Sequence, residues 1–187
     1  MSRVVIVYHS GFGVLQGLAE AVQAGVCRQP GSQASLLPVE QVEDRWDELH
    51  AADGIIFGAP SCMGSLSAPF KAFMDATAAF YLAQPWRDKP AAGFSHADLL
   101  CADPSQALAQ LALFAAQHGM LWVSLGLLPG AADADGTPLN RLGGSLGAQA
   151  QSSLDRAAES ALIHADRRTA AYLGERFALH LSQTLRR

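Results

Sequence analysis

The sequence predicts an α/β fold in which a parallel sheet carries helices on both faces. Short runs rich in β-branched residues alternate with longer stretches whose apolar residues recur at helical spacing, as a parallel sheet with crossover helices requires. Hydrophobic residues make up 50% of the chain and charged residues 16%, which suits elements buried on several sides. A length of 187 residues fits one sizeable core, so we expect residues 1–187 to form a single domain.

The expected elements alternate along the chain. Strands are predicted, in order, at residues 4–8, 34–39, 54–58, 91–94 and 121–125. Helices are predicted at residues 15–27, 67–80 and 105–117. Residues 126–153 are Gly-rich and too long for a routine connection, so we expect a binding loop there. The chain then ends in a closing helix, whose expected buried stripe is Ala171, Leu173, Phe177, Leu179 and Leu181.

The composition limits the classes of partner that the protein is expected to bind. The net charge of -4 and the scattered Lys and Arg residues argue against a nucleic-acid partner. Three distant cysteines, Cys27, Cys62 and Cys101, form neither a disulfide framework nor a metal-ligand pattern, so no metal is expected. No signal-peptide pattern and no apolar run of about 20 residues is present, so no membrane partner is expected. These observations together predict a cytoplasmic protein.

The first strand runs directly into the segment HSGFGV, residues 9–14, and then into a helix. This turn directs backbone N–H groups, the Ser10 hydroxyl and the positive end of the helix dipole at one point. Gly11 and Gly13 allow close approach of the backbone or positive φ. Neither a Lys-Ser or Lys-Thr pair after the glycines nor G-x-G-x-x-G spacing is present. The segment therefore predicts a neutral nest for a terminal monophosphate, with a merely structural tight turn as the alternative.

A second segment repeats this arrangement after the third predicted strand. Residues 59–66 form a polar, Gly-containing loop before the next helix. In a sheet of order 2-1-3-4-5 the first and third strands are neighbours at the point where the strand order reverses. The two loops are therefore expected to line one crevice.

On these two segments the chain resembles the flavodoxin-like superfamily and, within it, the WrbA-type NAD(P)H:quinone oxidoreductases. The first-loop pattern S-x-Y-G-x-I is met by Ser10, Phe12, Gly13 and Leu15. The second pattern, G-x-P-T-R-F-G-N before a helix ending F-L-D, is met by Gly58, Pro60, Ser61, Gly64, Phe73, Met74 and Asp75. The register continues to Tyr81, where the family has an active-site aromatic residue, and the segment QHGM matches the one that supplies a flavin-contacting histidine, His118.

The resemblance implies a flavodoxin-like, doubly wound, five-stranded parallel sheet of order 2-1-3-4-5 that binds FMN and not FAD. The residues implied to hold the phosphate are Ser10, Gly11, Phe12, Gly13, Val14 and Leu15. Those implied to lie against the ring are Pro60, Ser61, Cys62, Met63, Gly64, Ser65 and Leu66, with Ser95 and His96 from the loop after the fourth strand. Tyr81 and His118 are implied to be the catalytic residues, beside the substrate.

The implied reaction is a two-electron transfer from NAD(P)H through FMN to a quinone or similar small acceptor, in a homodimer or homotetramer. A flavodoxin-type electron carrier and a cofactor-free scaffold remain alternatives. Cys62 and Met63 stand where the family has Arg and Phe. Cys62 is open to two interpretations, a nucleophile with His9 or His118 as its base or, more simply, a small residue beside the flavin.

Overall fold

A computed structural model describes residues 1–11, 13–98, 103–152 and 164–184. Its sheet has the strand order β2-β1-β3-β5-β6, and these strands pair in parallel. The bounds are β1 Ser2–Tyr8, β2 Ser32–Pro38, β3 Gly54–Cys62, β5 Pro90–Asp98 and β6 Leu121–Trp122. The predicted α/β class and 2-1-3-4-5 order are therefore confirmed.

The third predicted strand is longer than its apolar run. β3 continues to Cys62 and then turns back into β4 (Ser65–Leu66), with Cys62 paired to Ser65. The two turn residues, Met63 and Gly64, both have positive φ, 51° and 77°, as a tight hairpin requires. The expectation of a loop over residues 59–66 is corrected here, because polar residues at the end of the strand keep its pairing.

The outer position beside β5 is shared by two strands, which was not expected. β6 ends at Trp122, short of the predicted residue 125, and the chain leaves the sheet over residues 123–147. It returns as β7 (Ala148–Ser152), which pairs with the carboxyl half of β5 from Phe94↔Ala148 onward. The predicted binding loop at 126–153 therefore contains a strand at its end. Its sequence, AQAQS, carries no β-branched residue that would have indicated it.

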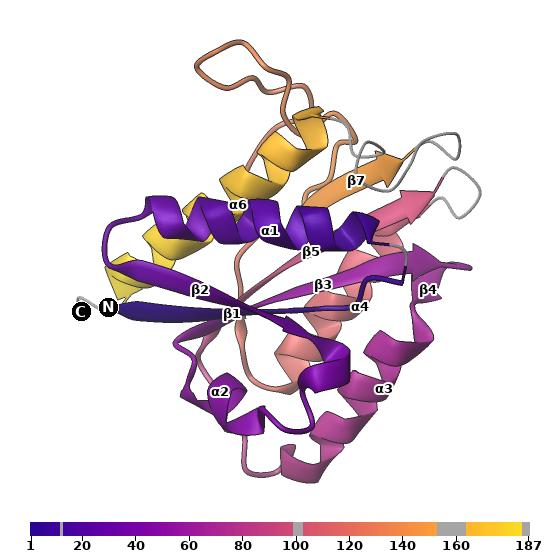
Figure 1. Ribbon diagram of the computed structural model, residues 1–187, viewed down its shortest axis with the longest axis vertical. Coiled ribbons are helices and arrows are strands. Elements are labelled where there is room, and N and C mark those ends of the chain that lie inside the picture. The colour runs from indigo at the N-terminus through magenta and orange to yellow at the C-terminus, as the bar shows by residue number, and fades with distance from the viewer. Residues whose placement is uncertain (12, 99–102, 153–163, 185–187) are drawn as a thin grey trace.

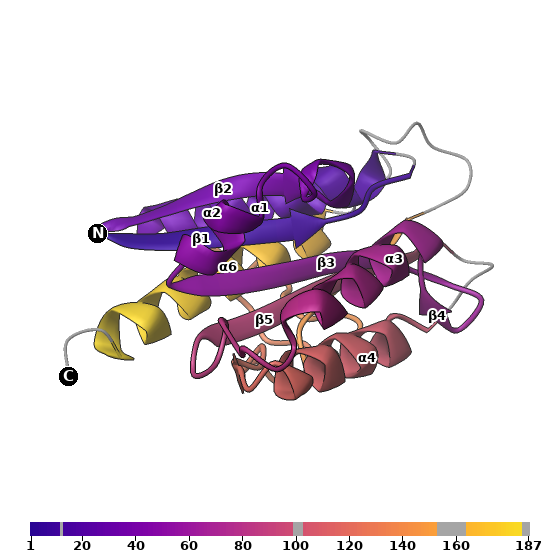
Figure 2. The ribbon, with the colours of Figure 1, turned by 90° about the horizontal axis from the view of Figure 1, so that it is seen from below.

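Helices cover both faces of the sheet (Figures 1 and 2). One face carries α1 (Val14–Arg28) and α6 (His164–Thr184), and the other carries the remaining helices. These are α2 Trp46–Ala51, α3 Ala68–Ala76 and α4 Pro104–Gln117, with the 3-10 turns η1 Val39–Gln41 and η2 Thr77–Phe80. Alternate residues of β1 point to opposite faces of the sheet, so Val4 and Ile6 belong to one hydrophobic core and Val5 belongs to the other.

The helices α1 and α6 pack closely against each other. A Cβ added at Gly25 would lie 1.9 Å from the Ala171 carbonyl oxygen, and one added at Gly174 would lie 2.1 Å from that of Val22. The two helices therefore touch backbone to backbone.

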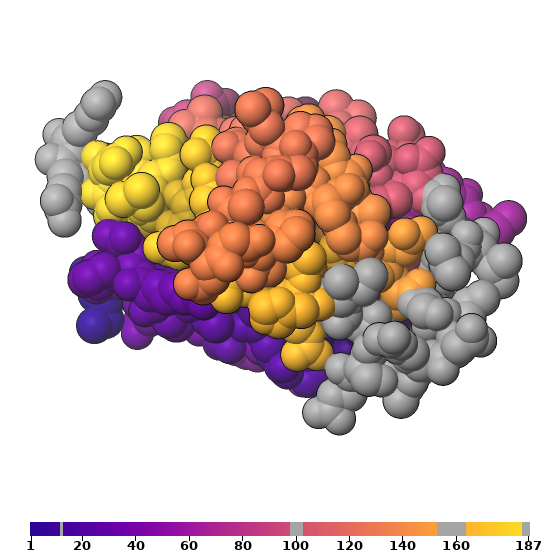
Figure 3. All heavy atoms as spheres, turned by 90° about the horizontal axis from the view of Figure 1, so that it is seen from above, coloured from indigo at the N-terminus to yellow at the C-terminus, as the bar shows by residue number. Residues whose placement is uncertain are grey.

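Figure 3 shows the segment 123–147, in orange, lying beside α6, in yellow. The Arg141 guanidinium ties this segment to α6 through Asp166, with both N···O distances 2.7 Å. None of the described helices is apolar over a length sufficient to span a bilayer.

Candidate functional site

A cavity of about 300 Å³ lies at the carboxyl ends of β1, β3 and β5. Ligands of doubly wound sheets bind in this crevice, beside the point where the strand order reverses. Both segments singled out in the sequence contribute to it, as expected. The residues that line the cavity are His9, Ser10, Gly11, Val14, Leu15, Pro60, Ser61, Cys62, Ser67 and His96.

The first segment forms a helix start with donors suited to an anion. Gly13 precedes α1 with φ 81°, a conformation that favours glycine. The first amides of a helix lack an intrahelical acceptor, and the Ser10 Oγ accepts a hydrogen bond from one of them, that of Gln16, at 3.1 Å. The Ser10 hydroxyl proton and the amides of Val14 and Leu15 then remain to donate to an anion, with the α1 dipole behind them. This donor set fits a phosphate.

The second segment supplies the opposite wall, through Pro60 and the exposed Cys62. Two buried hydroxyls support this wall by bonding to backbone. The Ser61 Oγ donates to the Asp103 carbonyl at 3.1 Å, and the Ser95 Oγ donates to the Ala59 carbonyl at 2.8 Å. Because both protons are used in this way, Ser61 and Ser95 hold the loops in place rather than offer hydrogen bonds to a ligand.

Five of the expected ring-contacting residues do not line the cavity: Ser95, whose hydroxyl is bonded as described above, and the four residues 63–66 of the β3–β4 hairpin. Met63 is 88% exposed at the tip of the hairpin, beside Gly64. The Ser65 Oγ donates to the Gln110 side chain of α4 at 3.0 Å, and Leu66 is buried in the core on the α3 and α4 side. The hairpin turns these residues away because β3 continues to Cys62. Phe12 lies outside the described residues.

Two histidines contribute rings to the cavity. His96 was expected there, and its Nε2 lies 2.8 Å from the Ser152 Oγ of β7. His9 and Ser67 were missed as lining residues, and they bond to each other, Nδ1 to Oγ, at 2.8 Å. Their positions in the sequence carry the signal that would have found them. His9 follows directly on β1, and Ser67 precedes α3 as its N-cap residue.

Tyr81 and His118 lie at the other end of the sheet and do not line this cavity. His118 follows α4, whose 14 residues place it about 21 Å from the helix start beside the cavity. Their rings are 6.2 Å apart, and Tyr81 is 46% exposed whereas His118 is 2% exposed. Within one chain, neither residue lines the cavity, and their role beside the flavin stays a prediction.

His118 is held in an aromatic cluster. Its ring centroid lies 4.8 Å from that of Trp86 and 5.0 Å from that of Phe114. The Thr77 hydroxyl donates to the Met74 carbonyl at 2.7 Å, so it accepts from the His118 Nε2–H at 2.8 Å. Burial lowers the pKa of His118, which keeps the ring neutral. His118 is therefore placed as a core histidine.

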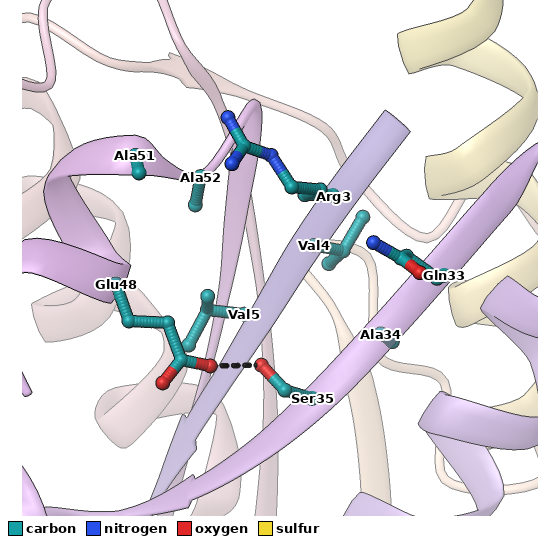
Figure 4. Close-up of a pocket in the computed structure, with 9 residues that line it drawn as sticks. All are labelled: Arg3, Val4, Val5, Gln33, Ala34, Ser35, Glu48, Ala51 and Ala52. Carbon is teal, nitrogen blue, oxygen red and sulfur yellow. Dashed lines mark hydrogen bonds between the residues drawn. The ribbon is translucent and has the colours of Figure 1, made fainter. Parts of the chain in front are cut away.

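Two other hollows lack the donor pattern of a cofactor site. One of about 350 Å³ lies over the amino halves of β1 and β2 (Figure 4). Its carboxylate, Glu48, already accepts from the Ser35 hydroxyl at 2.5 Å and from the Arg45 Nε at 2.8 Å. A groove of about 630 Å³ between η1, α2 and α3 is mainly apolar. The described residues contain no cluster of His, Cys, Asp or Glu able to hold a metal ion.

A doubly wound sheet of this order is a flavodoxin-like fold, and a phosphate-type helix start with a cavity at the switch point is typical of nucleotide-cofactor proteins with such sheets. Residues 17–128 match the family described as NADPH-dependent FMN reductase, and the chain belongs to that flavin-binding family.

Its relatives carry two kinds of name. Flavodoxin FldP of Pseudomonas aeruginosa is 39% identical over 165 residues, with 86% of each chain covered. Quinone-oxidoreductase QR2 of Triphysaria versicolor is 29% identical, covering 70% of this chain and 72% of that one. The crystal structure of a flavodoxin, WrbA-like protein from Agrobacterium tumefaciens superposes with a TM-score of 0.76 at 35% identity, covering 98% of this chain and 99% of that one.

Proposed function

We propose that this chain is an FMN-dependent oxidoreductase that takes two electrons from NAD(P)H and passes them to a quinone or a similar small acceptor. The observation that carries the proposal is the cavity at the carboxyl ends of β1, β3 and β5. It combines a helix start fit for a terminal phosphate with a largely non-ionic wall at Pro60 and Cys62. The quinone oxidoreductases among the relatives support the choice of acceptor.

The residues have distinct roles in this proposal. The backbone of residues 10–15 holds the phosphate, with Gly13 giving the turn its positive φ. Pro60 and Cys62 form the ring wall, and His96 borders the cavity from β5. Ser61 and Ser95 fix those loops through their bonds to backbone carbonyls. The bound flavin supplies the hydride and electron chemistry, so the protein needs to bind, orient and shield it.

Tyr81 requires a second subunit to act at a cavity. It lies at the opposite end of the sheet from the cavity of its own chain and is 46% exposed. We propose a homodimer or homotetramer in which Tyr81 borders a neighbouring chain's substrate space. His118, 2% exposed beneath it, would support that ring rather than touch substrate.

A flavodoxin-type electron carrier is the second candidate, favoured by the name of the 39% identical relative. An electron carrier binds large redox partners, and a surface patch of one charge sign commonly speeds association of that kind. The net charge of -4 over 187 residues offers little such steering. The enzyme is therefore the preferred proposal.

The test begins with the flavin released from freshly purified protein, identified as FMN or FAD by chromatography. NADH and NADPH oxidation is then followed with a benzoquinone acceptor over a grid of both substrate concentrations. We expect FMN and parallel double-reciprocal lines, because both substrates take turns at one flavin. FMN that accepts no electrons from either nicotinamide would favour the carrier. Protein that neither contains nor takes up a flavin would favour the scaffold.

A further inference from the structure

His9 is the first residue of the first cavity-forming segment, and its ring reaches the second segment. Its Nδ1 is 2.8 Å from the Ser67 Oγ, directly before α3. On its other edge, a Cβ built at Gly11 would lie 3.6 Å from the Cε1 and 3.9 Å from the Nε2 of His9. The ring is therefore held by the second segment, and its Cε1–Nε2 edge faces the first glycine of the phosphate-type loop.

The cavity has little positive charge to offer an anion. None of the described residues that line it is Lys or Arg. Carboxylates lie near Tyr8, which ends β1. Burial raises the pKa of Tyr8, and the charges of Glu20 and Glu40 raise it further. A phosphate monoester carries about two negative charges near neutral pH. Apart from the α1 dipole, the groups able to balance them among the described residues that line the cavity are imidazoles.

The two imidazoles of the cavity differ in position. His96 is engaged at its Nε2 by Ser152 of β7, on the side of β5 away from α1. The Nε2 of His9 lies beside Gly11, with the half-exposed Glu40 carboxylate 3.7 Å away, beyond hydrogen-bond distance. When the Ser67 hydroxyl donates to Nδ1, the neutral ring carries its proton on Nε2 and is a donor on that side. A protonated ring donates there as well.

We propose that His9 is the residue that recognises the flavin's terminal phosphate, with Ser67 as the positioning residue that keeps the Nε2 donor turned toward the phosphate loop. This inference rests on the proposed binding of FMN and deepens it. It assigns the discrimination between FMN and riboflavin, which lacks the phosphate, to one imidazole and the hydroxyl that orients it. The remaining donors of the loop, the Ser10 hydroxyl and the α1 amides, bind the same group without a full charge.

The test compares the affinity of FMN with that of riboflavin in flavin-free protein, measured by quenching of flavin fluorescence. The variants are His9→Gln and Ser67→Ala, and the matched control is His180→Gln, an exposed histidine on α6. For His9→Gln we expect the Kd of FMN to rise about tenfold, the effect of losing one hydrogen bond to a charged group, while that of riboflavin changes less than about twofold. Ser67→Ala should shift the same ratio in the same direction by about threefold.

Each outcome decides one point. Equal changes for FMN and riboflavin in His9→Gln would overturn the role in phosphate recognition, and so would an unchanged FMN affinity. A parent protein that binds neither flavin would overturn the proposed function itself. Thermal unfolding of both variants shows whether the fold is kept. Should His9→Gln not fold, the selectivity of Ser67→Ala decides, because an unchanged FMN-to-riboflavin ratio in that variant contradicts the proposal.

Discussion

His9 and His118 stand at opposite ends of one sheet, and each bonds through one ring nitrogen to a hydroxyl 2.8 Å away. The two histidines differ in their surroundings. His9 lines a cavity beside an acidic side chain, whereas His118 is buried among Trp86 and Phe114. A bonded hydroxyl is therefore no guide to function, and what distinguishes the two is whether the second nitrogen faces a space that a ligand can enter.

The largest contrast between the two ends comes from the loop beside His9. Gly13→Val should abolish detectable FMN binding, because a β-branched residue at φ 81° is strained and distorts the donors at the start of α1. The matched control is Gly31→Val, since Gly31 has φ 80° and open space around it at the amino end of β2. That control should lose a similar amount of stability and keep its FMN affinity. Loss of FMN binding in both variants would break the comparison.

At the other end, a substitution should cost stability and leave the cavity unchanged. His118→Ala removes a ring that is 2% exposed, so we expect a loss of about 2–4 kcal/mol in the free energy of unfolding, as for large-to-small changes in a core. The Kd of FMN should stay within about twofold of the parent value. Urea unfolding and FMN titration of the same preparation measure both quantities. If His118→Ala lost FMN affinity and kept the parent's stability, His118 would contribute to the flavin site after all.

The Gly13 experiment concerns a loop that the sequence predicted, and the His118 experiment concerns a residue whose place in the fold the sequence did not predict. The positions of the strands and the loop at Gly13 follow from local signals, namely apolar runs, spacing and a glycine before a helix, whereas the strand order was implied by the family resemblance. The hairpin that turns Met63 away was missed because its strand residues are polar, and the pairing partner β4 lies within the supposed loop. The resemblance placed His118 by its position in a motif. Which end of the sheet it occupies follows only from α4 running back along the sheet.

The pH dependence of stability should report His118 as well. Burial lowers its pKa below the ordinary 6.5, and burial with the charge of Lys89 lowers that of His50. Below about pH 6.5 the unfolded chain then binds more protons than the folded chain, so the free energy of unfolding falls as the pH falls. His118→Asn should show a smaller decrease between about pH 7.5 and 5.5 than the parent, measured by urea unfolding. The control His180→Asn should keep the parent's decrease, and a parallel loss of slope in both variants would contradict this account.

The smallest expected effect concerns the carboxylate beside His9. Glu40 lies 3.7 Å from the His9 Nε2, so its charge is close to an anion bound beside that ring. Its side chain is 57% exposed, so solvent and salt screen it, and Glu40→Gln should lower the Kd of FMN only about twofold by removing a repulsion from the phosphate. The effect should disappear at high salt and be absent for riboflavin. Glu43→Gln removes an equal charge from an exposed position on the same segment and serves as the control. Weaker FMN binding in Glu40→Gln would mean that the carboxylate orients the His9 ring instead of opposing the phosphate. His9 would then act as part of a Glu40–His9–Ser67 chain, and its contrast with His118, whose described hydrogen bond is to Thr77, would be sharper still.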